Sequence, residues 1–354
     1  MTTTADHVTM SDLRAAIDKL PRAGLAFLPT PLQLLPRLSA ELGGPPIYLK
    51  RDDLTGLAFG GNKVRKLDFF LGEAQRQECN VLVAGGGRAQ SNHARQCAAA
   101  ARAVGMHPVL VLQGGGLHQE LQGNLLLDHL LGAEVHFVEP EQIARDGPGA
   151  VSATMDRLAG EERARGNRPY VIHGSSQPLG TVGYVECALE LAEECARRDL
   201  DVRDVYVASY GGTQAGLLLG AGLLGAPWRI TGGNPGASHH GPEFVLDVAR
   251  RTAELLGLEP PPIDGRFRTV AAAGPGYGIL TPEAREAIRL LAHSEGVFLD
   301  PVYSGKGFAV LIRDIREQQL NPAYPVVFVH TGGLPALFAY QPELLDDDGP
   351  KSGR

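Results

Sequence analysis

Short runs of apolar and β-branched residues recur along the chain, and longer stretches of helical periodicity separate most of them. Strands that are covered on both faces of a sheet are apolar nearly throughout, so these runs predict buried strands. The runs are IYLK, NVLVAGG, PVLVLQG, EVHFVE, PYVIHG, DVYVAS, RITGG, RTVAAAG and VVFVHTGG.

The intervening amphipathic stretches predict helices, of which the clearest cover residues 63–78, 92–104, 179–198 and 282–294. Repeated strand–helix–strand units are typical of α/β proteins with mostly parallel sheets. A chain of 354 residues with 44% hydrophobic content is long enough to form two lobes. In such sheets ligands bind beyond the carboxyl ends of the strands, so the strand-to-helix junctions are where candidate chemistry is expected.

The first unusual junction is VLVAGGGRAQSNHARQ, in which three glycines separate a strand from a helix that begins near Asn92. Ser91 is a favourable residue for capping that helix. The free N–H groups of a first helical turn, together with a hydroxyl and an amide, can bind an anion. A plain capped helix would explain Ser91 but not the whole cluster Gln90-Ser91-Asn92-His93, so we favour a functional reading.

The second junction is DVYVASYGGTQAG, where Gly211, Gly212 and Thr213 precede a helix and allow a phosphate to approach the backbone. The motif GAGLLG follows, but it lies inside the predicted helix. A dinucleotide fingerprint requires the strand-to-helix turn, so we read these glycines as helix-packing residues and exclude NAD on this evidence.

Other candidates are weaker when taken singly. Thr331 follows a strand in VVFVHTGG, and Tyr277 and Tyr303 lie in the loops AAAGPGYGIL and FLDPVYSGKG. The pair His239-His240 has no third ligand at a recognisable spacing, so no metal site is predicted. Lys63 is more distinctive, because it begins a helix directly after a glycine pair in FGGNKVRKL.

Composition narrows the class of protein. The formal net charge is −7 and the basic residues are scattered, which argues against a nucleic-acid partner. The N-terminus lacks the apolar stretch of a signal peptide, and the most apolar segment is too short and glycine-rich to span a bilayer. The four cysteines form no C-x-x-C pair and read as free thiols. We therefore expect a cytoplasmic protein.

Three predicted features fit one binding site. They are two glycine-lined anion sites and a lysine beside the start of a third helix. One anion site can hold a cofactor phosphate and the other a substrate carboxylate, while the lysine can bond an aldehyde. Pyridoxal phosphate requires such a set.

The motifs YLKRDDLTGLAFGGNKVRKLDFF, AQSNHARQ, HGSSQPLGTVGYVECALE, GGTQAG, PGYG, DPVYSGKG and HTGGLPALFAY occur in an order that resembles the D-cysteine desulfhydrase / 1-aminocyclopropane-1-carboxylate (ACC) deaminase family. This resemblance implies pyridoxal 5'-phosphate as cofactor and the tryptophan synthase β-like fold (fold type II), with two open, twisted, mostly parallel-sheet domains. It implies a large cofactor-binding domain (1–62 and 179–354) and a small domain (63–178) carrying the substrate carboxylate site.

The resemblance also implies residue roles. Lys63 matches the Schiff-base lysine, and Tyr277 and Tyr303 complete the catalytic set with Ser91. The cofactor would be held by Lys63 and by Lys66, Asn92, Gly211, Gly212, Thr213 and Thr331. The substrate would meet Ser91, Asn92 and His93. The expected partners are a small amino-acid substrate and a second copy of the chain, with no nucleic acid or membrane.

The choice of reaction depends on three positions. ACC deaminases as a class read DPVYEGK and HLGG, whereas this chain has Ser304 and Thr331, and His93 fits the desulfhydrase pattern. A hydroxyl partner leaves the cofactor's ring nitrogen largely neutral, which suits expulsion of a good leaving group. We therefore expect β-elimination from D-cysteine to give pyruvate, hydrogen sulfide and ammonia. L-Cysteate sulfo-lyase is the main alternative, ACC deaminase a weaker one, and a silent pyridoxal phosphate-binding protein the non-enzymatic one.

Overall fold

Two separate β-sheets organise the chain in the computed structural model, which describes residues 7–209, 211–236 and 241–345. The larger sheet has the order β1-β2-β10-β7-β8-β9, and all its neighbours are parallel except the β1–β2 pair. Its strands are β1 (Leu32–Leu34), β2 (Ile47–Lys50), β7 (Asp204–Val207), β8 (Arg229–Asn234), β9 (Phe267–Ala271) and β10 (Val326–Val329).

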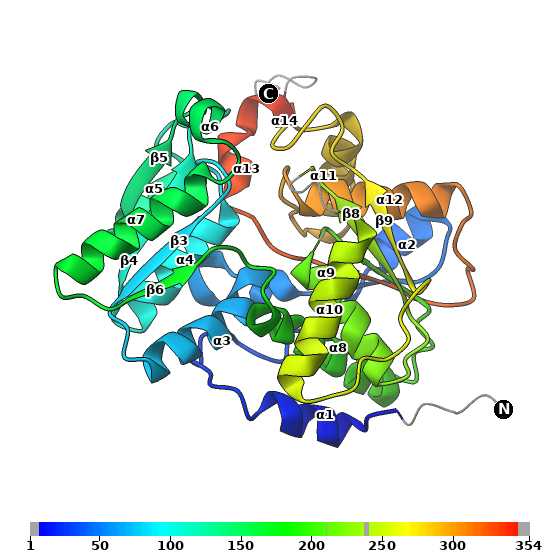
Figure 1. Cartoon of the computed structure of the whole chain (residues 1–354). Coiled ribbons are helices and arrows are strands. Elements are labelled where there is room, and N and C mark those ends of the chain that lie inside the picture. Colours follow the sequence, from blue (N-terminus) through cyan, green and yellow to red (C-terminus); the bar gives the residue numbers. More distant parts are fainter. Residues whose placement is uncertain (1–6, 210, 237–240, 346–354) are drawn as a thin grey trace.

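The smaller sheet has the order β5-β4-β3-β6 and is parallel throughout (Figure 1). Its strands are β3 (Val81–Gly85), β4 (His107–Gln113), β5 (Glu134–Val138) and β6 (Pro169–Ile172). Both faces are covered. Leu82 and Leu110 pack toward the alanine-rich helix α4, whereas Val83 and Val111 pack with Met155 of helix α7 on the other face.

Helices connect and cover these sheets. The first half of the chain holds α1 (Met10–Ile17), α2 (Pro36–Leu42), η1 (Asp52–Leu54), η2 (Leu57–Phe59), α3 (Asn62–Arg76), α4 (Asn92–Ala103), α5 (Gly123–Leu130), α6 (Pro140–Asp146) and α7 (Ala150–Ala164). The second half holds α8 (Pro178–Arg198), α9 (Gly212–Leu223), α10 (Pro242–Leu256), α11 (Pro282–Glu295), α12 (Ser304–Arg316), α13 (Ala336–Ala339) and α14 (Gln341–Leu345). None of the helices in the described ranges is both long and apolar enough to cross a bilayer.

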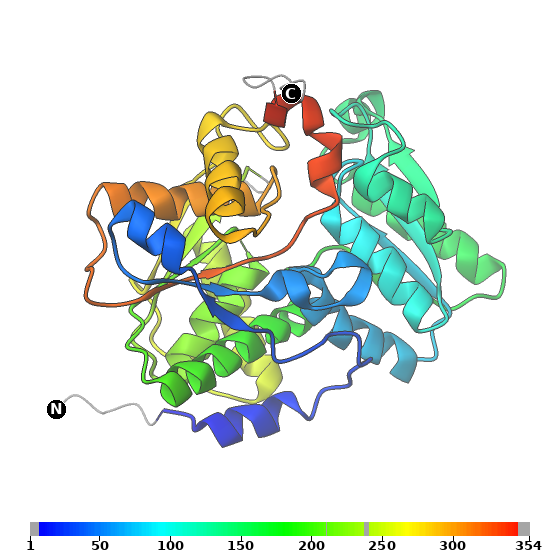
Figure 2. The same ribbon diagram turned by 180° about the vertical axis from the view of Figure 1, so that it is seen from behind.

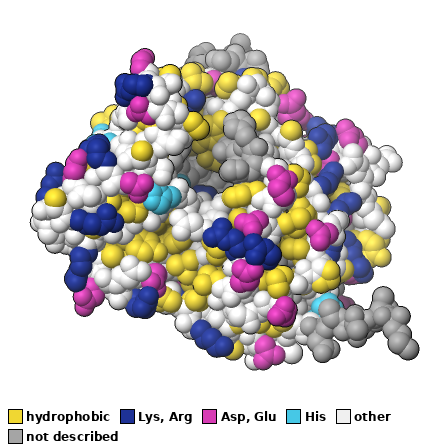
Figure 3. All heavy atoms as spheres, in the orientation of Figure 1, with side chains coloured by type: hydrophobic (Ala, Val, Ile, Leu, Met, Phe, Trp, Pro, Cys, Tyr) yellow, Lys and Arg dark blue, Asp and Glu magenta, His cyan; other side chains and the backbone are white. Residues whose placement is uncertain are grey.

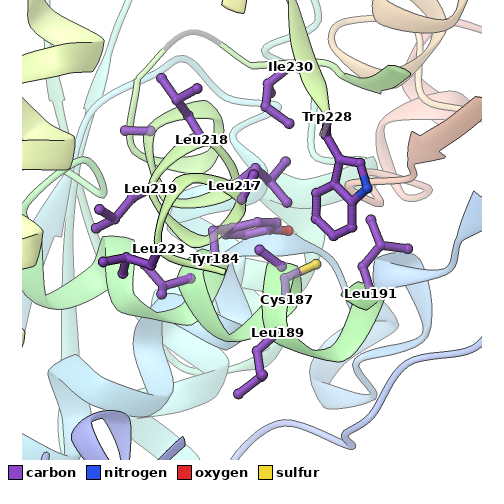
Figure 4. Close-up of a cluster of buried hydrophobic side chains, with 14 of the residues drawn as sticks. Tyr184, Cys187, Leu189, Leu191, Leu217, Leu218, Leu219, Leu223, Trp228 and Ile230 are labelled. Carbon is purple, nitrogen blue, oxygen red and sulfur yellow. The ribbon is translucent and has the colours of Figure 1, made fainter. Parts of the chain in front are cut away.

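The core of the larger lobe forms where α8 and α9 pack together beside β8 (Figure 4). Leucines of α9, Tyr184 and Cys187 of α8, and Trp228 and Ile230 at β8 are all buried there. Gly220 has Ala188 of α8 directly beside it, with the Ala188 side chain 2.5 Å from the place of a Cβ. Gly220 therefore packs two helices closely, as predicted, whereas Gly222 faces Pro261 and Ile263 in the segment between α10 and β9.

The sequence predictions of fold class and of all nine quoted strands are confirmed, and the four quoted helices match α3, α4, α8 and α11 within two residues at each end. Strand β1 was missed. It is a three-residue, antiparallel edge strand, which is too short to give a clear apolar run. All strands of the smaller sheet lie between residues 81 and 172, but the domain boundaries given above stay a prediction.

Helix α3 lies where the two lobes meet, packed against α8 of the larger lobe and α4 of the smaller one (Figure 2). Arg65 fixes it there. Its guanidinium donates to Asp52 (2.8 and 2.9 Å) and to Glu190 (2.8 Å to each oxygen), and its side chain is fully buried. Lys50 donates to Glu190 (2.6 Å), and Tyr184 donates to Asp52 (2.7 Å). Two cations thus balance two carboxylates inside the core.

Loss of Arg65 should therefore be costly. In Arg65→Met the two buried carboxylates would lose their bidentate partner, and we expect the free energy of unfolding to fall by about 3–5 kcal/mol. Arg14→Met is the matched control, because its bridge to Glu193 is exposed at 44% and 41% and should be worth at most about 1 kcal/mol. Urea unfolding of both variants measures the difference, and equal losses would contradict the assigned role of the buried cluster.

Candidate active site

The predicted site segments meet at the junction of the two lobes. The backbone N–H of Asn62 donates to the carbonyl of Thr331 (3.0 Å), and its side-chain amide donates to the hydroxyl of Thr213 (3.2 Å). On the other side, the Nδ2 atom of Asn92 lies 2.8 Å from the place of a Cβ at Gly333. The loops after β3, β7 and β10 and the start of α3 therefore surround one volume. The same face of the molecule is hollowed between the lobes (Figure 3).

Lys63 begins α3 after an unusual stretch of backbone. Ala58, Phe59, Gly60 and Gly61 all have positive φ angles, of 45°, 68°, 62° and 124°. A side chain at Gly61 would collide with Gln96 and approach the Thr331 carbonyl to 3.0 Å. Only glycine fits at position 61, and the turn places Lys63 in the site.

Lys63 carries a perturbed amine. Burial lowers its pKa to about 8, and only the nearby Cys97 thiol acts in the opposite direction. No carboxylate in the described part of the chain pairs with the Lys63 ammonium group. The lowered pKa increases the share of neutral, nucleophilic amine at this position at neutral pH.

The second lysine, Lys66, lies one turn further along α3 and faces the start of α9. Its Nζ atom donates to the carbonyl of Ser175 (3.0 Å) and is 3.0 Å from the place of a Cβ at Gly212. The Gly212 N–H donates to the hydroxyl of Ser176 (3.0 Å), and the Thr181 hydroxyl borders the same space. Burial lowers the pKa of Lys66 well below its usual value, and the charge of Lys63 adds to this effect.

This space is suited to a phosphate group. It has a buried lysine without a carboxylate partner, hydroxyl groups, and a helix N-terminus whose first residue has no side chain. Gly211, Gly212 and Thr213 lie at it as expected, and α9 begins at Gly212. Ser176 and Thr181 were missed, although both lie in the quoted motif HGSSQPLGTVGYVECALE.

The N-terminus of α4 forms the opposite side. The Ser91 hydroxyl accepts from the Ala94 N–H (3.2 Å) and donates to the Gly86 carbonyl (3.2 Å), so Ser91 is the predicted N-cap. The Asn92 side-chain oxygen accepts from Asn124 (2.9 Å). Their position beside Lys63 and the free first-turn N–H groups would suit a carboxylate or ring oxygen.

His93 is half buried and contacts the thiol of Cys97 (3.5 Å). Burial, reinforced by the charges of Lys63 and Lys66, lowers its pKa to about 3. The imidazole is therefore neutral at physiological pH and can offer a hydrogen bond but no charge.

Tyr277 and Tyr303 form a pair through their hydroxyl groups, which are 2.5 Å apart. The place of a Cβ at Gly87 is 2.9 Å from the Ser91 hydroxyl and 3.7 Å from that of Tyr277, so both hydroxyls border the same small space. Burial raises the pKa of both tyrosines, while their mutual bond lowers that of Tyr277 and raises that of Tyr303. Tyr303 therefore acts as the donor when Tyr277 carries negative charge.

A buried carboxylate that sequence reasoning missed lies beside Thr331. Asp300 accepts from the Ser304 hydroxyl and N–H (both 2.6 Å), and from the N–H groups of Val302 and Tyr303 (both 3.0 Å). Its Cγ atom is 2.6 Å from the place of a Cβ at Gly333. Burial raises the pKa of Asp300, and these bonds oppose the increase.

Asp300 distinguishes the two hydroxyl positions noted in the sequence. The Ser304 hydroxyl donates to Asp300 (2.6 Å). Thr331 is 7% exposed at the end of β10 and keeps its hydroxyl available. Asp300 opens the quoted motif DPVYSGKG, which was the signal that could have identified it.

The described residues hold no cluster of three His, Cys, Asp or Glu side chains arranged for a metal ion. The pair His239-His240 lies outside the described residues.

Comparisons with known proteins agree with this geometry. The family model described as pyridoxal-phosphate dependent enzyme matches residues 24–332. A protein of Salmonella choleraesuis (strain SC-B67) named D-cysteine desulfhydrase is 40% identical over 343 residues, covering 93% of this chain and 98% of its own. A Pyrococcus abyssi (strain GE5 / Orsay) protein provisionally named 1-aminocyclopropane-1-carboxylate deaminase is 37% identical over 335 residues, covering 94% and 97%.

A solved structure described as an ACC deaminase homologue superposes with a TM-score of 0.84 at 35% identity, covering 95% of this chain and 98% of the other. The family match covers most of the chain, and the two lysines of α3 and the donors at the start of α9 fit the cofactor. The chain therefore belongs to the pyridoxal phosphate-dependent enzymes, as a fold type II lyase of the D-cysteine desulfhydrase / ACC deaminase family.

Proposed function

We propose that this enzyme catalyses β-elimination from a small β-substituted amino acid, with D-cysteine as the first candidate. The products would be pyruvate, hydrogen sulfide and ammonia. The observation that carries the proposal is the position of Lys63, an amine with a lowered pKa that lies between the start of α9 and the Ser91–Tyr277 hydroxyls. When bound, pyridoxal phosphate supplies an electron sink for negative charge at the substrate's Cα. A homodimer in the cytoplasm remains part of this proposal.

Lys63 would bond the cofactor aldehyde and, after the substrate amine has replaced it, would remove the Cα proton. Its pKa of about 8 suits both tasks, because a proton-transfer group works best near the operating pH. Lys66, Ser176, Thr181 and the start of α9 would hold the phosphate.

Ser91, Asn92 and the first-turn N–H groups of α4 would orient the substrate carboxylate, with neutral His93 adding a hydrogen bond. The Tyr277–Tyr303 pair would supply a proton to the departing thiolate, since Tyr303 supports negative charge on Tyr277. The Cβ–S bond breaks with its electrons on sulfur, and water then releases ammonia and pyruvate.

Thr331 supports elimination over cyclopropane opening. Its free hydroxyl would face the ring nitrogen of the cofactor, while the nearest carboxylate, Asp300, already accepts bonds from Ser304 and from backbone N–H groups. A neutral partner stabilises a carbanion less, so a substrate with a good leaving group is favoured.

Three alternatives are kept. L-Cysteate offers sulfite as a good leaving group and fits the same argument. ACC deamination remains a weaker candidate, because one relative of this chain carries that name. A silent pyridoxal phosphate-binding protein is least favoured, since Lys63 and the tyrosine pair are all in place.

The first prediction concerns cofactor attachment. Borohydride reduction followed by peptide mass spectrometry should locate the cofactor on Lys63, and Lys63→Ala should show no fixed cofactor. Lys66→Ala is the matched control. It should keep the covalent link but bind the cofactor about 10- to 100-fold more weakly, since it loses one charge-assisted bond. Label on any other lysine would refute the assignment.

The second prediction concerns pH. Only the neutral amine attacks an aldehyde, so covalent attachment of the cofactor to the apoenzyme should speed up as pH rises through about 8, where Lys63 loses its proton. Stopped-flow absorbance at several pH values measures this rate. An inflection near the usual lysine pKa, above 10, would show that burial does not activate the amine.

The third prediction concerns reaction choice. D-Cysteine, β-chloro-D-alanine or L-cysteate should release pyruvate, and ACC should give little or no 2-oxobutyrate. Thr331→Val should lower kcat about tenfold, because it removes one hydrogen bond to the ring nitrogen of the cofactor. The cofactor should still attach to the variant. If 2-oxobutyrate from ACC forms fastest, the elimination proposal fails. If L-cysteate is best, the leaving group changes but the mechanism stands.

A further inference from the structure

Arg88 is an unused cation at the edge of the site. It lies half buried in the glycine-rich loop between β3 and α4, and its side chain makes no hydrogen bond or ion pair with any described residue. It lines a cavity between the two lobes. The lining includes Arg88, Gln90 and Leu117 from the smaller lobe and Tyr277, Val302 and Tyr340 from the larger one.

This cavity is continuous with the proposed site. The Arg88 carbonyl accepts from the Ser91 N–H (2.9 Å), and Tyr277 borders both the cavity and the space beside Ser91. Burial raises the pKa of Tyr277 and of Tyr340, and the positive charge of Arg88 works against the increase at both. The guanidinium is thus near the two hydroxyl groups.

Two carboxylates lie near the cavity, and the charges of both raise the pKa of Tyr340. Glu343 is 3.0 Å from His118, whose ring lies tilted against Tyr340 with centroids 4.0 Å apart. Asp300 accepts from Ser304 and from backbone N–H groups. Neither carboxylate is within ion-pair distance of Arg88, so its guanidinium is available to bind an anion in the cavity.

An amino acid in the site leaves one substituent for this cavity. Its amine must face Lys63 and its carboxylate must face Ser91, so the group on Cβ turns toward the remaining opening, which Tyr277 borders. The cavity has a volume of about 20 Å³. The cavity is narrow, so the substituent must be compact.

We propose that Arg88 forms an anion subsite for the substituent on the substrate's Cβ and selects compact groups that carry or acquire negative charge. This inference rests on the elimination proposed above. Lys63 takes the Cα proton, the Cβ–X bond breaks, and the electron pair leaves with X, whose negative charge Arg88 stabilises.

Whether X carries its charge before the reaction determines which kinetic constant Arg88 affects. A sulfonate is charged before and during the reaction, so Arg88 would mainly lower KM. A thiol or chloro substituent becomes an anion only as the bond breaks, so Arg88 would mainly raise kcat.

Binding of unreactive amino acids provides the primary test, because it does not require turnover. Aspartate carries a charged β-substituent without a leaving group, and alanine carries none. In calorimetric titrations of the holoenzyme, the ratio of aspartate to alanine affinity, for whichever handedness binds, should fall at least tenfold in Arg88→Gln and recover partly in Arg88→Lys. Arg145→Gln, an exposed control with the same change in net charge, should leave the ratio unchanged.

An unchanged ratio in Arg88→Gln, or a wild-type enzyme that does not prefer aspartate, would overturn the subsite. Kinetics on the same variants separates this outcome from failure of the proposed function. If wild type releases pyruvate and Arg88→Gln matches it in kcat and KM for every substrate, only the Arg88 inference fails. If the affinity ratio falls but no substrate yields pyruvate, the subsite stands and the elimination proposal fails.

Discussion

The bidentate bonds of Arg65 to Asp52 and Glu190 are the constraint on which the site depends. Asp52 follows β2, Glu190 lies on α8, and Arg65 lies on α3, so one guanidinium joins a strand end and two helices. A buried arginine bridging two carboxylates has few alternative arrangements. The orientation of α3 fixes where Lys63 and Lys66 point, and the arrangement of the lobes around the site follows from it.

The three cations at the start of α3 have different environments, and these environments give them different pKa values. Arg65 is neutralised by carboxylates, and its pKa is raised well above the usual value, with burial opposing Asp52 and Glu190. Lys63 and Lys66 lie in the same helix without such partners, and burial lowers the pKa of both. The protein thus keeps one permanent cation for structure and two amines of lowered pKa, which match the nucleophilic and phosphate-binding roles proposed for them.

On the side of the site formed by α12 and its neighbouring loops, charged residues and hydroxyl groups also have separate roles. Asp300 is committed to holding the turn that begins α12, and through it the positions of Tyr303 and Ser304. Lys306, in the same motif, donates to the carbonyls of Ala273 (2.7 Å) and Gly276 (3.0 Å) and so holds the loop of Tyr277. Charged residues here shape the backbone, while the hydroxyl groups of Thr331 and of the tyrosine pair are left facing the site.

The sequence alone determined the α/β class, the nine apolar strands and the junctions where candidate residues lie. Those properties follow from local periodicity and from glycines that only certain turns can use. The motifs also assigned the family, and they placed Lys63 and Ser91 at helix starts and Thr331 after a strand, in segments that the structure brings together. Helix α4 starts at its predicted cap because capping is a local interaction.

Only the tertiary structure decided which polar groups share an environment. The pairing of Arg65 with Glu190 spans 125 residues, and Gly212 meets Ser176 from a different loop. The Ser304 hydroxyl donates to Asp300, a contact that exists only once the turn before α12 has formed. Burial, which lowers the pKa of Lys63, depends on packing between segments distant in sequence, and no local pattern encodes it.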